Sequence, residues 1–169
     1  MTVRADAGTA FDGRHFFQIA KDAIRKVDAA TGEVVGTLPL PPKGMAAGLT
    51  WAEGTLWLAL FQEGKILQLD PETGRVLRTI DATPFVTGIT FVDGELWHGT
   101  WEGEEGKQSE LRRVDPASGE VKERLAMPAG ERVSGVESDG GELLYCGGGP
   151  SGKVRAVRRP RRGTAGRSS

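Results

Sequence analysis

Cysteine and histidine are scarce in this sequence, and long apolar runs are missing. Cys146 is the single cysteine among 169 residues, which excludes an intrachain disulfide and favours a reducing, cytoplasmic setting. Two isolated histidines and one cysteine match no ligand spacing, so the sequence predicts no metal site and indicates no cofactor. No stretch approaches the length of a transmembrane span, and the first residues lack the apolar core of a secretory signal. We therefore expect no membrane association.

Acidic residues are absent from the C-terminal part of the chain. Seven of the 22 basic residues lie from Lys153 onward, whereas all 23 acidic residues precede that point. The body is therefore acidic although the formal net charge is −1, which argues against nucleic-acid binding by the domain itself. Residues 158–169 are basic, contain Pro, Gly and Ser, and are nearly free of apolar side chains, so we expect a disordered tail.

Glycine is abundant, and many of the glycines recur at equivalent positions of a sequence repeat. The chain has 25 glycines and 9 prolines, spread as they would be in many tight turns. Residues 48–57 align without gaps on residues 88–97; residues 135–144 keep the two glycines and the apolar end, and residues 8–17 align with one deletion. A turn motif of Asp, three residues and Gly recurs as well, beginning at Asp28, Asp70 and Asp115. The repeat predicts units near 7–40, 46–82, 86–127 and 133–157.

The residue pattern of each unit is typical of four short strands. In the second unit we expect them near 46–52, 55–60, 65–70 and 75–80. Residues 56–60 are apolar on both faces, as in a strand of a sheet that is covered on both sides. The sequence thus predicts an all-β protein, a β-propeller of about four four-stranded blades.

The repeat motifs resemble a known group of proteins. Gly, an apolar residue, Thr and an aromatic residue begin the unit; Gly-x-Leu-Trp and Asp-Pro-x-Thr-Gly-x-Val follow. Over roughly residues 7–158 this resembles the repeats of YVTN-type and glutamine-cyclotransferase-like bacterial β-propellers. The resemblance implies the propeller fold, which serves both enzymes and binding proteins. The nearest enzymes are plant-type glutaminyl cyclases, which cyclise N-terminal glutamine, but no catalytic residue is carried over to this chain.

The fourth unit has room for three strands only, which leaves two ways to complete the molecule. Residues 2–4 would add the missing outer strand and close a small ring within one chain. Alternatively, the chain is an open arc, which is either truncated or completed by a second copy as a homodimer, because open sheet edges invite pairing.

The candidate site lies in the loops at one end of the predicted channel, where propellers usually bind ligands. The third unit carries a five-residue insertion within residues 98–109, and Trp101 lies outside the repeat pattern. Trp101 would stack on a ligand, Glu102 would bind a cation or act as a base, and His98 would transfer protons. The alternative is that His98 bonds a neighbouring loop and that Glu102 is a solvated loop residue. The complete set of ligand-binding candidates is His98, Trp101, Glu102, Phe85, Arg132 and Cys146.

Cys146 and the tryptophans of the repeat have structural interpretations. Cys146 begins a glycine-rich loop that lacks the ending of a phosphate loop, and a structural thiol is the simpler interpretation. Trp51, Trp57 and Trp97 occupy repeat positions and are expected to pack between blades. The sequence favours a scaffold that binds a small molecule or a protein partner through its loop face. The alternative is an enzyme, a glutaminyl-peptide cyclotransferase or a ring-opening lyase.

Overall fold

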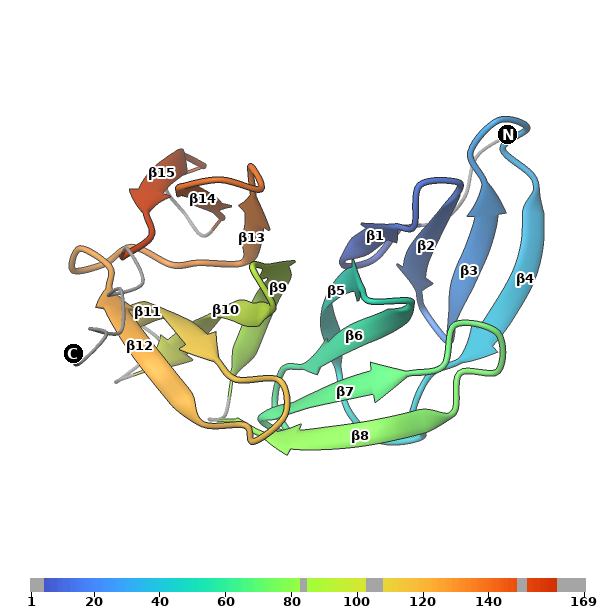
Figure 1. Cartoon of the computed structure of the whole chain (residues 1–169), viewed down its shortest axis with the longest axis horizontal. Coiled ribbons are helices and arrows are strands. Elements are labelled where there is room, and N and C mark those ends of the chain that lie inside the picture. Colours follow the sequence, from blue (N-terminus) through green and yellow to red (C-terminus); the bar gives the residue numbers. More distant parts are fainter. Residues whose placement is uncertain (1–4, 83–84, 103–107, 149–151, 161–169) are drawn as a thin grey trace, which may run out of the picture.

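Four antiparallel sheets follow one another along the chain as the blades of a β-propeller (Figure 1). The computed structural model describes residues 5–82, 85–102, 108–148 and 152–160. The strands of the first two blades are β1 (Thr9–Phe11), β2 (His15–Ala20), β3 (Ala23–Asp28), β4 (Val34–Pro39), β5 (Ala46–Ala52), β6 (Thr55–Leu60), β7 (Lys65–Leu69) and β8 (Val76–Asp81). Those of the last two are β9 (Val86–Val92), β10 (Glu95–Glu102), β11 (Gln108–Val114), β12 (Val121–Ala126), β13 (Gly135–Ser138), β14 (Leu143–Gly147) and β15 (Val154–Arg158). The predicted all-β propeller is confirmed.

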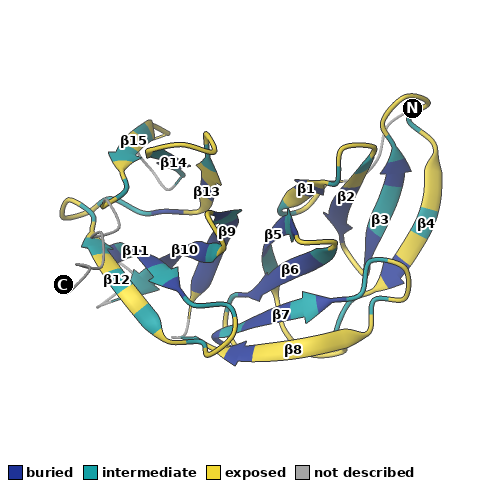
Figure 2. Ribbon diagram, viewed as in Figure 1, coloured by how far each residue is buried: buried dark blue, intermediate teal, exposed yellow. Residues whose placement is uncertain are grey.

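The first strand of every blade lies innermost. Strands β1, β5, β9 and β13 adjoin one another in that order, while β4, β8 and β12 form the exposed outer rim (Figure 2). The run from Leu56 to Leu60 is buried throughout, as its two-sided apolar pattern predicted. The fourth sheet has three strands, β13, β14 and β15, within the described residues. Residues 2–4, which were expected to supply a fourth, lie outside them.

Three hydrophobic clusters hold the blades together. One joins the first and second blades through Phe17 and Leu56, and one joins the second and third through Trp57 and Leu96. The last joins the third and fourth blades and contains Trp97. Within the described residues no such cluster joins the fourth blade to the first, and Figure 1 shows an opening between β13 and β1. The described part of the chain is thus the open arc of the two predicted arrangements.

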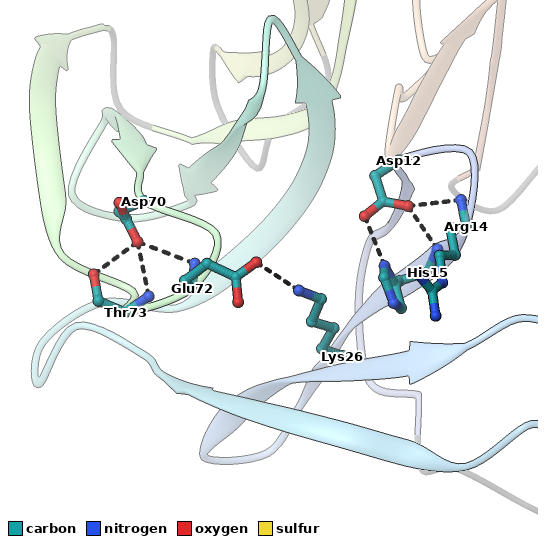
Figure 3. Close-up of polar contacts among 7 residues, drawn as sticks. All are labelled: Asp12, Arg14, His15, Lys26, Asp70, Glu72 and Thr73. Carbon is teal, nitrogen blue, oxygen red and sulfur yellow. Dashed lines mark hydrogen bonds and ion pairs between the residues drawn. The ribbon is translucent and has the colours of Figure 1, made fainter.

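The recurring Asp turn closes the outer hairpin of each of the first three blades. In the second blade, Oδ1 of Asp70 accepts hydrogen bonds from the backbone N–H of Glu72 (3.0 Å), and from the backbone N–H and hydroxyl of Thr73 (both 2.8 Å) (Figure 3). Gly74 follows with φ of 72°, a left-handed conformation that favours glycine. The same turn holds Glu72 2.6 Å from Nζ of Lys26, so that it also bridges to the first blade.

The structure corrects the expected ends of two segments. His98 and Trp101 belong to strand β10, not to a loop, because β10 and β11 stay paired out to Glu102. Residues 103–107, which include most of the insertion, lie outside the described residues. At the other end, Arg158 is the last residue of β15, and Arg159 donates a backbone hydrogen bond to Glu142 (2.8 Å). The rest of the expected tail, residues 161–169, is outside the described part of the chain.

Candidate functional site

A cavity of about 560 Å³ lies where the four innermost strands begin. Each blade contributes residues from the first part of its inner strand, and the first, second and fourth blades also contribute residues just before it: 6–9, 45–49, 87–89 and 134–137. Two aromatic side chains, Phe61 and Trp101, complete the lining. The sequence predicted a site at this end of the molecule, and the volume of the cavity falls in the range of small-molecule sites.

The aromatic side of the cavity is a connected set of rings. The ring of Phe61 meets the edge of Trp101 at a centroid distance of 5.2 Å, and it lies at 5.2 Å from Phe85. Phe85 is exposed and has φ of 64°, an unusual backbone conformation for a bulky residue. The guanidinium of Arg132 lies 5.3 Å from the Trp101 ring, within reach of a cation–π interaction. The structure therefore brings together three of the predicted site residues, Phe85, Trp101 and Arg132.

Trp101 is fixed in place by backbone hydrogen bonds. Its indole Nε1 donates to the carbonyl of Val133 (2.7 Å), and its backbone N–H donates to the carbonyl of Phe85 (3.1 Å). Gly99 makes this approach possible, because a Cβ there would lie 2.5 Å from side-chain atoms of Thr87 and Val133. A ring held in this way can stack on a ligand at little entropic cost.

His98 lies apart from the cavity, fully buried between the second and third blades. Its Nδ1 is 3.0 Å from the carbonyl oxygen of Gly99, and its Nε2 has no hydrogen-bond partner within the described residues. Burial lowers the pKa of His98 to about 4, helped by the nearby positive charge of Arg112. The imidazole is therefore neutral at pH 7. In this position it contributes to the contact between the blades.

Glu102 belongs to an ion-pair cluster around Arg112. The guanidinium is almost completely buried and pairs with Glu102 and, at 2.8 Å, with Glu110. Partial burial favours the neutral form of Glu110, but the hydrogen bond and charge of Arg112 outweigh it and lower the pKa of that carboxyl. The cluster joins β10 to β11 beside the insertion, and Glu102 thus has a partner that the sequence did not reveal.

Cys146 packs in the hydrophobic cluster between the third and fourth blades. Burial raises the pKa of its thiol, so the protonated form prevails at neutral pH. This placement agrees with the structural interpretation of the cysteine. Within the described residues, no group of three or more His, Cys, Asp or Glu side chains is arranged to hold a metal ion.

Several lining residues were missing from the sequence-based candidates. Phe61, Met45, Asp6 and Glu137 all line the cavity. Phe61 is the first residue after β6, in the loop between the second and third strands of its blade, so its position in the repeat was a usable signal. Glu137 lies within β13 and accepts a hydrogen bond from the hydroxyl of Thr90 (2.7 Å). Nothing in its sequence context separates it from an ordinary strand residue.

Comparisons with known proteins agree with this architecture. No family model matches the chain, and no curated protein matches it. The crystal structure of Myxococcus xanthus glutaminyl cyclase is similar at a TM-score of 0.70 and 15% identity, over 89% of this chain and 71% of that one. The computationally designed Ika4 protein is similar at a TM-score of 0.62 and 14% identity, over 93% of each chain.

The chain shares the β-propeller fold of that glutaminyl cyclase. At these identities the likeness concerns the fold alone, so the resemblance inferred from the repeat is confirmed at that level. The YVTN-type label stays a prediction. Within the described part of the chain there is no helix that could cross a membrane.

Proposed function

We propose that this chain is a binding scaffold that takes a small molecule, or the end of a protein partner, into its central cavity. The cavity of about 560 Å³ supports the proposal most directly, because all four inner strands and the aromatic rings of Phe61 and Trp101 converge on it. The cytoplasmic location expected from the single cysteine remains a prediction.

The lining indicates the chemistry of the ligand. One side offers Phe61, Trp101 and Met45, which suit a planar or apolar group. Asp6 and Glu137 place carboxylates in the wall formed by the first and fourth blades, and these suit an amine or another hydrogen-bond donor. A compact molecule with an apolar body and a cationic or amide-bearing end fits both sides.

A thermal-shift screen of small metabolites and short peptides tests the proposal. We expect binders to raise the melting temperature of the wild-type chain and to lose that effect in Trp101→Ala. His98→Leu serves as the matched control, because His98 is buried outside the cavity lining. The proposal fails if hits stabilise the wild type and Trp101→Ala equally.

A second candidate is glutaminyl-peptide cyclotransferase activity, favoured by the similarity to the Myxococcus xanthus enzyme. In that reaction the N-terminal amine attacks the side-chain amide carbon of glutamine, a C–N bond closes the ring, and ammonia leaves. Glu137, in the cavity wall, is the carboxylate on this chain best placed to accept the amine proton. A peptide with N-terminal glutamine should then release ammonia, and Glu137→Gln should abolish the release. Absence of ammonia would leave binding as the function.

A further inference from the structure

Each end of the arc carries an exposed sheet face, and the corresponding face is buried in the other blades. The face of a blade toward the next one along the chain is here called its trailing face, and the opposite one its leading face. On the trailing face, one residue of the second strand pairs across the sheet with the residue that lies two positions after the repeated glycine of the inner strand. In the four blades these residues are Phe17, Trp57, Trp97 and Tyr145.

Within the described residues, nothing covers the trailing face of the fourth blade. Phe17, Trp57 and Trp97 are 0–3% exposed because each packs against the following blade, whereas Tyr145 is 41% exposed. An equivalent position on the third strand of each blade, also on the trailing face, shows the same contrast in exposure. In the first three blades it holds Ile24, Ile66 and Leu111, all 0% exposed, but in the fourth it holds Val154, which is 74% exposed. The fourth blade thus presents an apolar surface of the kind that receives another blade.

The glycine that recurs at the inner strand of each blade shows the same difference between the fourth blade and the others. A Cβ at Gly8, Gly48 or Gly88 would lie 2.5–2.7 Å from the backbone of the next inner strand. These glycines therefore allow neighbouring inner strands to approach closely. At Gly135, the fourth member of the series, a Cβ would meet nothing within 4 Å. The glycine is present, and the strand it would accommodate is not in the described chain.

The leading face of the first blade is the second exposed apolar sheet face. Phe11, Phe16, Val27 and Val34 form a row across all four of its strands. In later blades the position of Phe16 holds Leu56, Leu96 and Leu144, each 0% exposed against the preceding blade. Phe16 itself is 42% exposed and packs on Phe11 at a centroid distance of 4.9 Å.

We propose that these two faces bind each other between two copies of the chain. The trailing face of the fourth blade in one copy packs on the leading face of the first blade in the other, as consecutive blades already do three times within each chain. A twofold arrangement makes this contact twice and leaves no blade face open. The cavity residues on β1 and β13 then lie beside the new contacts, so the second copy completes the wall of the site.

Complementation between variants tests this pairing by sedimentation equilibrium. Val154→Asp disables the trailing face and Phe16→Asp the leading face, both at exposed positions where circular dichroism should report an unchanged fold. We expect the wild type to have twice the chain mass of 18.0 kDa and each variant alone to have 18.0 kDa. An equal mixture should regain two-chain particles, because each variant retains the face that its partner lacks.

Two further variants separate the proposal from general effects. Leu77→Asp, at an exposed apolar position on the outer strand β8, should keep the wild-type mass. Gly135→Ala adds a methyl group that meets no atom of the described residues within 4 Å, so it should fold normally and yet weaken the association. The proposal is overturned by a wild-type mass of one chain or of more than two. It is also overturned if Val154→Asp or Phe16→Asp alone keeps the wild-type mass, or if their mixture stays at 18.0 kDa.

Discussion

The indole Nε1 of Trp101 lies 2.7 Å from the backbone carbonyl oxygen of Val133, which it bonds as a donor. This contact ties the second strand of the third blade to the segment that enters the fourth blade. It also orients the ring toward the cavity and against Phe61. A residue outside the repeat pattern thus links the structure of the arc to its candidate site.

The hydrogen bond of Trp101 should be separable from its ring. Trp101→Phe keeps an aromatic surface but leaves the carbonyl of Val133 without its donor, and we expect a loss of about 1 kcal/mol in the free energy of unfolding. Trp101→Ala should cost about 3 kcal/mol, because the contact with Phe61 goes as well. Urea denaturation measures both values. Equal losses in the two variants would contradict the assigned role of the ring.

Gly88 and Gly135 provide a matched pair for the inner-strand contacts. A Cβ at Gly88 would lie 2.5 Å from the backbone nitrogen of Val136, whereas one at Gly135 would meet no atom within 4 Å in the described part of the chain. Gly88→Ala should therefore destabilise the chain by about 2 kcal/mol or more, through forced separation of the third and fourth blades. Gly135→Ala, measured on the dissociated chain, should change stability by less than about 0.5 kcal/mol. Similar effects in both would refute the proposed function of this glycine.

The buried His98 should make the fold sensitive to mild acid. Its pKa is about 4 in the folded chain against 6.5 in the unfolded one, so below pH 6.5 the unfolded state binds the proton that the folded state refuses. Stability is full above pH 6.5 and decreases as the pH falls toward 4, by as much as about 3 kcal/mol. His98→Leu should remove this dependence, because Leu58 occupies the same position in the second blade. An unchanged pH profile in that variant would contradict the assignment.

Asp70 should make the stability of the fold depend on pH in a second, more acidic range. Hydrogen bonds from the Thr73 hydroxyl and from the backbone of Thr73 and Glu72 lower its pKa below 3.8. Its contribution is therefore present above the unfolded pKa and is lost as the pH falls through the folded one. Asp70→Asn keeps an acceptor for the turn without the charge, so its melting temperature should vary less between pH 5 and pH 2 than that of the wild type. Parallel curves would show that the charge of Asp70 does not stabilise the turn.

The sequence was sufficient to predict the blades because each repeat carries its own structural signals. The inner glycine, the aromatic residue of the second strand and the Asp turn all recur along the chain, and such a repeat marks each blade in the sequence. The fourth blade was harder to align. Its first turn is one residue longer, so that Tyr145, not Leu144, corresponds to Trp57.

The candidate site was predictable only in part. Trp101 stood out because it breaks the repeat pattern, whereas the burial of His98 depends on how far β10 stays paired with β11. The contribution of Glu137 depends on contacts between blades that are distant in sequence. Such non-local contacts leave no mark on a single sequence.

The most direct test of the proposed site is fluorine NMR of the chain labelled with 5-fluorotryptophan. Its four tryptophans give four resonances, and Trp101→Phe assigns the one that reports on the cavity. Titration with the strongest binder from the screen should shift the Trp101 resonance and leave those of Trp51, Trp57 and Trp97 in place. A titration that moves one of the other three while Trp101 stays fixed would contradict binding in the central cavity.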